Sequence, residues 1–220
     1  MKIGVVYTGI SPTLLADINS EIGRVLPGAD IMIFSDPSLL SECIANGVTR
    51  QVEQRLVGLY WAAAKAGADI VYNVCSSVGD VADDAAPLFA KMGLPLIRID
   101  EKMASDAVAM GKKIGIVATL NSTLEPTKRL VARKSKELDK DVEIVDILVD
   151  GAYGKPPDVM NTMILEKVAQ LVGKVDVILL AQASMNPCHN EIVDRYGLTA
   201  FASPVSGADY LKQTADLLGT

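Results

Sequence analysis

The chain has 220 residues, of which 50% are hydrophobic and 22% are charged, a composition of folded globular proteins that excludes extensive disorder. Its formal net charge of -6 disfavours a nucleic acid or an anionic membrane as a general partner. Three cysteines at unrelated spacings and one histidine form neither a disulfide framework nor a pattern of metal ligands, so we expect no metal site. We therefore expect a small-molecule partner.

Apolar stretches are numerous but short. The N-terminal run in MKIGVVYTG is too short for a signal sequence, and no apolar stretch reaches the length of a membrane span. We therefore expect a cytoplasmic protein.

Short β-branched runs alternate with stretches of helical periodicity along the whole chain. Nearly continuous apolar strands separated by helices predict parallel sheets covered on both faces, which is an α/β fold. Ser122 or Thr123 before Glu125 and Pro126 predicts one helix start, and Asn186-Pro187 predicts another. The predicted strands are 2–8, 30–35, 70–74, 95–99, 113–119, 142–148, 175–181 and 198–202, and the predicted helices include 49–66, 81–91, 125–138, 161–172 and 207–218.

The chain repeats itself. KIGVVYT at 2–8 recurs 111 residues later as KIGIVAT, and AKAGADIVYNVCSS at 64–77 is echoed by LVGKVDVILLAQAS, with Asp176 lying 107 residues after Asp69. Unrelated α/β units share such patterns too, but the common order and the nearly equal spacing favour duplication. We therefore expect two pseudo-symmetric halves, the first formed by residues 1–100 and 205–220 and the second by residues 101–204.

Four predicted strand ends carry small residues, hydroxyls and amides but little charge. In parallel sheets ligands bind beyond the carboxyl ends of the strands, so we expect these segments to converge on one cleft if the halves face each other. Such N–H and O–H donors suit an anion, most naturally a carboxylate, and the hydroxyls can also cap helices. The candidate binding residues are Gly9, Ser11, Asn73, Ser76, Ser77, Thr119, Asn121, Ser122, Thr123, Gln182, Ala183 and Ser184.

These strand ends and the duplicated KIGVVYT and KIGIVAT starts resemble the aspartate/glutamate racemase superfamily, which includes hydantoin racemases, maleate cis-trans isomerases and arylmalonate decarboxylases. The resemblance covers essentially the whole chain. It implies two Rossmann-like halves related by a pseudo-twofold axis, an active site between them, and no metal or organic cofactor. It also implies a catalytic cysteine at one strand end in each half, and Cys75 matches the first of these, followed by the donors Ser76 and Ser77.

The second cysteine position departs from the racemase pattern. The family's Gly-Cys-Thr context places Ala183 where the second thiol belongs, whereas the register of Asp69 and Asp176 places Gln182 opposite Cys75. Neither side chain can transfer a proton usefully. Cys188 is the remaining candidate for a second catalytic thiol, although a thiol packed under its helix is the simpler interpretation.

Three functions are compatible with these residues. The first is proton transfer at the carbon alpha to the carboxylate of an amino acid or related small acid, with Cys75 as acid and base, which implies a racemase-like isomerase. The second is a decarboxylase, cis-trans isomerase or lyase that needs only one cysteine. The third is a carboxylate-binding protein without catalysis. Apolar content and exposed sheet edges also make a homodimer or homotetramer plausible.

Overall fold

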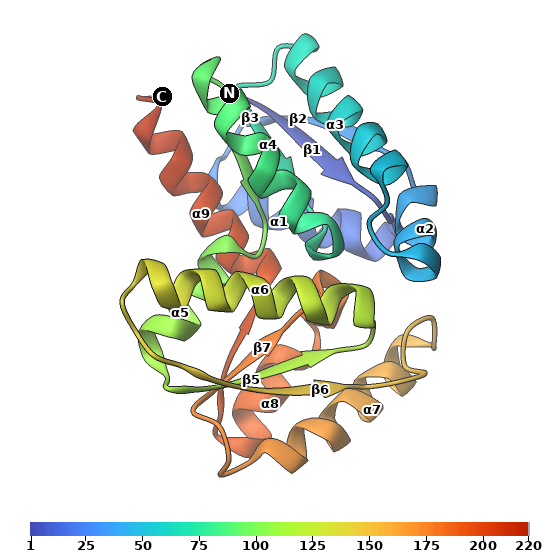
Figure 1. Ribbon diagram of the computed structural model, residues 1–220, viewed down its shortest axis with the longest axis vertical. Coiled ribbons are helices and arrows are strands. Elements are labelled where there is room, and N and C mark those ends of the chain that lie inside the picture. The colour runs from blue at the N-terminus through green and yellow to red at the C-terminus, as the bar shows by residue number, and fades with distance from the viewer. Residues whose placement is uncertain (220) are drawn as a thin grey trace. The chain divides into compact units, whose positions relative to one another are not determined.

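The computed structural model describes residues 1–219 and divides the chain into two compact α/β units (Figure 1). Unit 1 comprises Met1–Ile99 and the C-terminal segment that begins at Gly207, and unit 2 comprises Asp100–Ser206. Each unit contains one four-stranded parallel sheet flanked by helices. The predicted fold class, an α/β fold with two similar halves, is confirmed.

Unit 1 has the strand order β2-β1-β3-β4, with every neighbouring pair parallel. The elements of unit 1 are β1 (Lys2–Tyr7), α1 (Pro12–Val25), β2 (Asp30–Ser35), α2 (Ser38–Asn46), α3 (Arg50–Lys65), β3 (Ile70–Asn73), the 3-10 turn η1 (Ser76–Val78), α4 (Gly79–Lys91) and β4 (Leu96–Arg98). Helix α9 (Ser203–Leu217) begins in unit 2 and lies mostly in unit 1.

Unit 2 repeats this topology, with the strand order β6-β5-β7-β8. The elements of unit 2 are α5 (Glu101–Met110), β5 (Lys113–Ala118), α6 (Asn121–Glu137), β6 (Glu143–Leu148), α7 (Pro157–Val168), η2 (Ala169–Leu171), β7 (Val177–Leu180), η3 (Ala183–Met185), α8 (Cys188–Tyr196) and β8 (Thr199–Ala202).

The strands adjacent to the centre of each sheet are the most apolar. In β1 and β5 every residue after the first is buried, and β3 and β7 are buried throughout. Strands β2 and β6 lie at one edge of their sheets and are only partly buried, whereas β4 at the other edge of the unit 1 sheet is buried. The continuous apolar runs in the sequence therefore correspond to strands covered on both faces.

All eight predicted strands are present, each within two residues of its predicted bounds. The predicted start of the helix at 125–138 is wrong, because α6 begins one turn earlier at Asn121 and Pro126 lies inside it. Leu120 is the N-cap residue, so Ser122 and Thr123 lie in the first turn instead of capping it. Helix α7 also begins earlier than predicted, with Pro157 in its first turn, where a missing N–H costs nothing.

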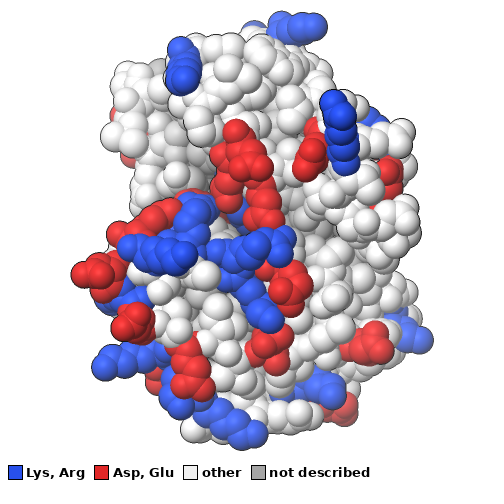
Figure 2. All heavy atoms as spheres, in the orientation of Figure 1, with Lys and Arg blue, Asp and Glu red and all other residues white. Residues whose placement is uncertain are grey.

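Charged side chains on the surface are mostly interleaved by sign. Lys and Arg gather over α6, and acidic side chains lie among them (Figure 2). Arg133 and Lys134 of α6 both form ion pairs with Glu101 of α5 and Glu137 of α6. Within residues 1–219, no helix is long and apolar enough to cross a membrane.

Helix α3 packs closely on β1 because Gly4 lacks a side chain. A Cβ atom at Gly4 would lie 2.7 Å from the Cβ atom of Ala63. We expect Gly4→Ala to lower the free energy of unfolding by about 1–3 kcal/mol in urea denaturation. Gly23→Ala in α1 is the matched control, because nothing lies within 4 Å of its Cβ position, and it should stabilise by roughly 0.4–1 kcal/mol. Equal effects of both substitutions would contradict this packing.

Candidate active site

The parallel register of β1 and β3 brings Thr8 and Cys75 to the same edge of the unit 1 sheet. Val6 is paired with Asn73, and the Val74 N–H donates to the Val6 carbonyl over 2.9 Å, so the chain leaves both strands side by side. Thr8 is fully buried and Cys75 is half-buried, whereas Cys43 and Cys188 are buried. Among the cysteines, only Cys75 therefore offers its side chain at a strand end.

Opposing effects act on the Cys75 thiol. Burial is the largest, and it raises the pKa of Cys75 because a thiolate is poorly solvated there. Hydrogen bonds from the Thr8 hydroxyl, the Ser77 hydroxyl and the backbone N–H groups of Ser77 and Val78 lower the pKa in part. The thiol is thus protonated at neutral pH, and donors are already in place for the thiolate once the proton has left.

The Thr8 hydroxyl stabilises the thiolate form of Cys75. It is buried without an oxygen or nitrogen atom as a hydrogen-bond partner, and it lowers the pKa of Cys75 because a thiolate accepts a hydrogen bond from it. A buried hydroxyl without an oxygen or nitrogen partner costs stability. Its position next to Cys75 therefore favours a site in which charge develops on sulfur.

Asn73 fixes the backbone of the Cys75 segment. Its Nδ2 donates to the Cys75 carbonyl over 3.0 Å, and its Oδ1 accepts a hydrogen bond of 3.1 Å from the Tyr60 hydroxyl. Asn73 and Tyr60 are both fully buried, so the hydrogen bond between them is shielded from water. The predicted binding residue Asn73 thus supports the loop from beneath.

The remaining predicted residues of unit 1 have different surroundings. Ser76 and Ser77 are buried in η1 directly after the thiol. Gly9 lies under Leu40, whose Cδ2 atom would be 2.5 Å from an added Cβ. Ser11 is exposed and caps α1, since its Oγ accepts from the Leu14 N–H over 3.1 Å. The structure therefore brings Ser76 and Ser77 to the thiol and gives Ser11 a capping role.

The strand end of unit 2 has the same layout, with an amide in place of the thiol. Ala181 N–H donates to the Val117 carbonyl over 2.9 Å, as Val74 does to Val6, and Gln182 occupies the position that corresponds to Cys75. The Gln182 Oε1 accepts from the Thr119 N–H over 2.6 Å, and its Nε2 donates to the Thr119 hydroxyl over 2.8 Å. Each unit thus pairs a threonine with a polar side chain at this point.

Ala183 follows Gln182 as the first residue of η3, just as Ser76 follows Cys75 in η1. The internal register therefore makes Gln182 the counterpart of Cys75 within the chain. That Ala183 replaces a second catalytic cysteine of the family stays a prediction.

The other predicted residues of unit 2 lie at the start of α6 and in η3. Asn121 and Ser184 are exposed, whereas Thr123 is buried. The Ser122 Oγ is buried without a hydrogen-bond partner. None of these side chains ionises near neutral pH, so they can bind an anion but cannot exchange a proton with it.

Cys188 lies in the apolar core of unit 2, fully buried in the first turn of α8. Its Sγ donates to the Asn161 Oδ1 over 3.2 Å, and burial with the nearby Glu191 carboxylate raises the pKa of Cys188 to about 11. The adjacent His189 ring lies 2.9 Å from the Ala200 carbonyl through Nε2, which ties α8 to β8. These surroundings are those of a packed structural thiol.

The structure adds Thr8, Tyr60 and Arg98 to the site residues named from the sequence. Arg98 could have been recognised as a candidate from the sequence, because it is a charged residue near the end of the apolar strand predicted at 95–99. Thr8 was the last residue of the strand predicted at 2–8, but the sequence alone did not indicate its contact with sulfur. Tyr60 had no signal, since it lies on the buried face of an ordinary amphipathic helix.

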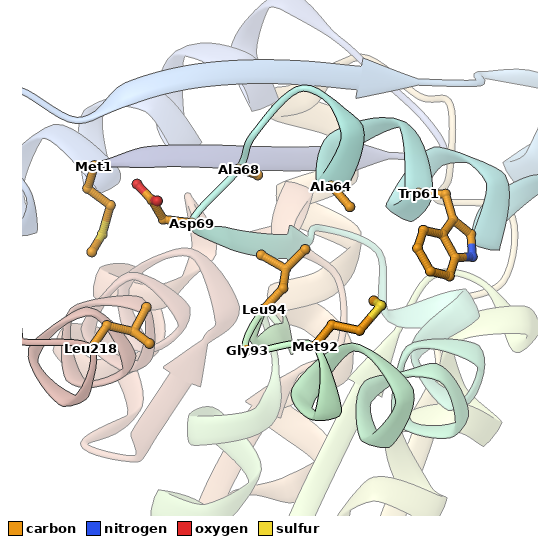
Figure 3. Close-up of a pocket in the computed structure, with 9 residues that line it drawn as sticks. All are labelled: Met1, Trp61, Ala64, Ala68, Asp69, Met92, Gly93, Leu94 and Leu218. Carbon is orange, nitrogen blue, oxygen red and sulfur yellow. The ribbon is translucent and has the colours of Figure 1, made fainter.

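A cavity of about 480 Å³ lies at the opposite edge of the unit 1 sheet, beside the amino ends of β3 and β4 (Figure 3). Its lining is largely apolar, with Trp61, Met92, Leu94 and Leu218 around the single carboxylate of Asp69. None of the strand-end residues described above lines it. Over residues 1–219, no group of three or more His, Cys, Asp or Glu side chains is arranged to hold a metal ion.

Comparisons with known proteins define the family. Residues 3–210 match the family described as Asp/Glu/Hydantoin racemase, so the chain belongs to that family of enzymes. No curated protein matches the sequence.

Solved structures of racemases share the fold. Allantoin racemase from Klebsiella pneumoniae has a TM-score of 0.69 at 14% identity, covering 100% of this chain and 89% of that chain. Glutamate racemase isoform RacE1 from Bacillus anthracis has a TM-score of 0.76 at 17% identity, covering 99% and 82%. An arylmalonate decarboxylase has a TM-score of 0.60 at 13% identity, covering 100% and 93%. At these low sequence identities, the structural similarity shows a shared fold and nothing more.

The paired threonines offer a matched test of the two strand ends. Thr8→Val removes a donor to the thiolate, so we expect the pKa of Cys75 to rise and its alkylation by iodoacetamide at fixed pH to slow about tenfold. Thr119→Val removes the acceptor for the Gln182 amide, so we expect a loss of about 1–3 kcal/mol in urea unfolding without a change in Cys75 alkylation. Unchanged alkylation in Thr8→Val would contradict the contact with sulfur.

Proposed function

We propose that this protein is a cofactor-independent enzyme that transfers a proton at the carbon alpha to the carboxylate of an amino acid or related small acid, with Cys75 as the acid and base. The observation that supports this most strongly is the half-buried thiol at the carboxyl end of β3, surrounded by donors that stabilise its thiolate. Parallel sheets bind ligands at this edge.

The chemistry follows from these surroundings. A thiolate at Cys75 takes the proton from the alpha carbon, and the resulting thiol returns a proton to the carbanion. Because burial raises the pKa of Cys75, its thiolate is a stronger base than an exposed one and better suited to a weakly acidic carbon. Uncharged hydroxyl and N–H donors of the strand-end loops suit the substrate carboxylate and the negative charge that develops on it during proton removal.

The names of the structural relatives support the substrate class. Two of them are named as racemases, one of allantoin and one of glutamate. Glutamate is an amino acid, so that name agrees with a substrate of this chain among amino acids and related small acids.

A second candidate reaction is favoured by Gln182. Racemisation with two bases needs one acid and one base on opposite faces of the same carbon, and Gln182 in the position equivalent to Cys75 does not ionise. A decarboxylase, cis-trans isomerase or lyase that uses a single thiol needs no second group of this kind. Binding of a carboxylate without turnover is the remaining alternative.

Solvent deuterium exchange tests the proposal. We expect the intact protein in deuterium oxide to incorporate deuterium at the alpha carbon of a substrate drawn from amino acids, hydantoins and substituted malonates, followed by NMR. Cys75→Ala should abolish incorporation, because Cys75 is the acid and base in this proposal. Cys188→Ala is the matched control and should retain activity, because its thiol lies in the core.

The products separate the candidate reactions. Inversion of configuration supports a racemase, whereas release of carbon dioxide with one labelled enantiomer supports the single-thiol decarboxylase. Thermal stabilisation by a ligand without deuterium exchange on any substrate class would contradict the catalytic proposal and support a binding protein.

The pH dependence of exchange has a defined sign. Proton abstraction requires the thiolate, so its rate should rise with pH and level off only above the raised pKa of Cys75. The Thr8→Val variant should move this profile to higher pH, because it loses a donor to the thiolate. A profile that falls from neutral to alkaline pH for the abstraction step would contradict the role of Cys75 as the base.

A further inference from the structure

A buried arginine lies next to the segment that carries the thiol. Arg98 is the last residue of β4, is paired in register with Asn73 of β3, and is only 2% exposed. Its Nη1 forms an ion pair of 2.6 Å with the Asp83 carboxylate of α4, which is 32% exposed. Burying such a pair brings little net stability, and well-packed apolar residues often do as well. The arginine therefore calls for an explanation other than stability alone.

The guanidinium occupies the space next to Gly79. A Cβ atom at Gly79 would lie 2.0 Å from the Arg98 Nη2 and 2.2 Å from its Cζ, so any larger residue would have to displace the guanidinium. Gly79 does not have a positive φ, so its backbone conformation does not itself require glycine. The absence of a side chain at Gly79 is thus explained by the guanidinium that packs on it.

Gly79 joins this contact to the thiol. It is the first residue of α4 and caps η1, with its N–H donating to the Ser76 carbonyl. The two residues between, Ser77 and Val78, supply the backbone N–H donors to the Cys75 sulfur. On its other side the guanidinium is held by Asp83, one turn into the same helix. The contacts of Arg98 with Gly79 and Asp83 therefore hold the first turn of α4 in place between β4 and the loop that follows β3.

We propose that Arg98 is a positioning residue for Cys75: its buried guanidinium packs on Gly79, binds Asp83, and thereby holds the Ser77 and Val78 N–H groups toward the sulfur. The functional value of this arrangement rests on the catalytic role proposed for Cys75 above. The arrangement itself is a property of the resting protein and can be measured without a substrate.

Other groups also act on this thiol and must be kept constant. Cys43 of α2 and Tyr60 of α3 interact electrostatically with Cys75, and Arg98 and Asp83 act on Tyr60 in opposite directions. Tyr60 and Cys43 are protonated over the neutral range, since burial raises the pKa of both. They therefore carry no charge at neutral pH, where the titration of Cys75 starts.

The test is the pH dependence of Cys75 alkylation in the full chain, followed by mass spectrometry of the peptide that contains Cys75. We expect Arg98→Met to move the midpoint to higher pH and to slow alkylation about tenfold at a fixed pH below it, because the N–H donors are no longer held in place. Arg24→Met is the matched control, since Arg24 is an exposed arginine of α1 that pairs with Glu21 and Asp209.

Gly79→Ala is a second test of this contact, and it keeps the positive charge of Arg98. Its methyl group must displace the guanidinium, so we expect the same slowing as in Arg98→Met. The double variant should be no slower than either single variant, because both disrupt one contact. If Arg98→Met fails to fold, Gly79→Ala still tests the contact between Arg98 and Gly79. Hydrogen exchange at the Ser77 and Val78 amides should be faster in each variant.

Two results would overturn the inference. The first is a wild-type alkylation profile in Gly79→Ala and in any folded Arg98→Met protein. The second is full rescue by Arg98→Lys, which would show that charge alone suffices without the packed planar group. Because alkylation needs no turnover, these results are independent of whether deuterium exchange is observed, and the two proposals can fail separately.

Discussion

The parallel pairing of β1 with β3 is the constraint on which the site depends. It makes both strands end at one edge of the unit 1 sheet, and the register of Val6 with Asn73 then places Thr8 beside Cys75. The pairing of β5 with β7 repeats the arrangement and places Thr119 beside Gln182. One topology therefore builds two similar strand ends, and of the two equivalent side chains Cys75 can exchange a proton whereas Gln182 cannot.

The protonation state of Cys75 depends on a balance between burial of the side chain and hydrogen bonds donated to its sulfur. Burial disfavours the thiolate more than the surrounding hydroxyl and N–H groups favour it, so the resting thiol keeps its proton. The donors are held by buried polar contacts that reach back into the sheet and α3, through Asn73 and Tyr60 on one side and Arg98 on the other. Such contacts cost more than apolar packing unless they are complete, which fits a site where geometry matters more than stability.

Much of this arrangement could be predicted from the sequence. Short β-branched runs predicted all eight strands, the central ones most clearly because those are buried on both faces, and the repeat predicted two similar halves. The start of α6 was misplaced because Pro126 is tolerated within the helix once Leu120 takes the N-cap position. The contacts of Thr8 with Cys75, of Gln182 with Thr119 and of Arg98 with Gly79 join residues far apart in the chain. They depend on strand register and on side-chain packing, which periodicity does not specify.

The central claim is that Cys75 is a protonated thiol, held by donors at the place where a small carboxylate binds. An NMR titration of the Cβ resonances in protein labelled at cysteine, with and without a small carboxylate, tests it most directly. We predict that Cys75 titrates above the ordinary range of an exposed cysteine, because burial raises its pKa, and that its resonance shifts when the carboxylate is added. A Cys75 that titrates like an exposed thiol and ignores every carboxylate tested would contradict the account.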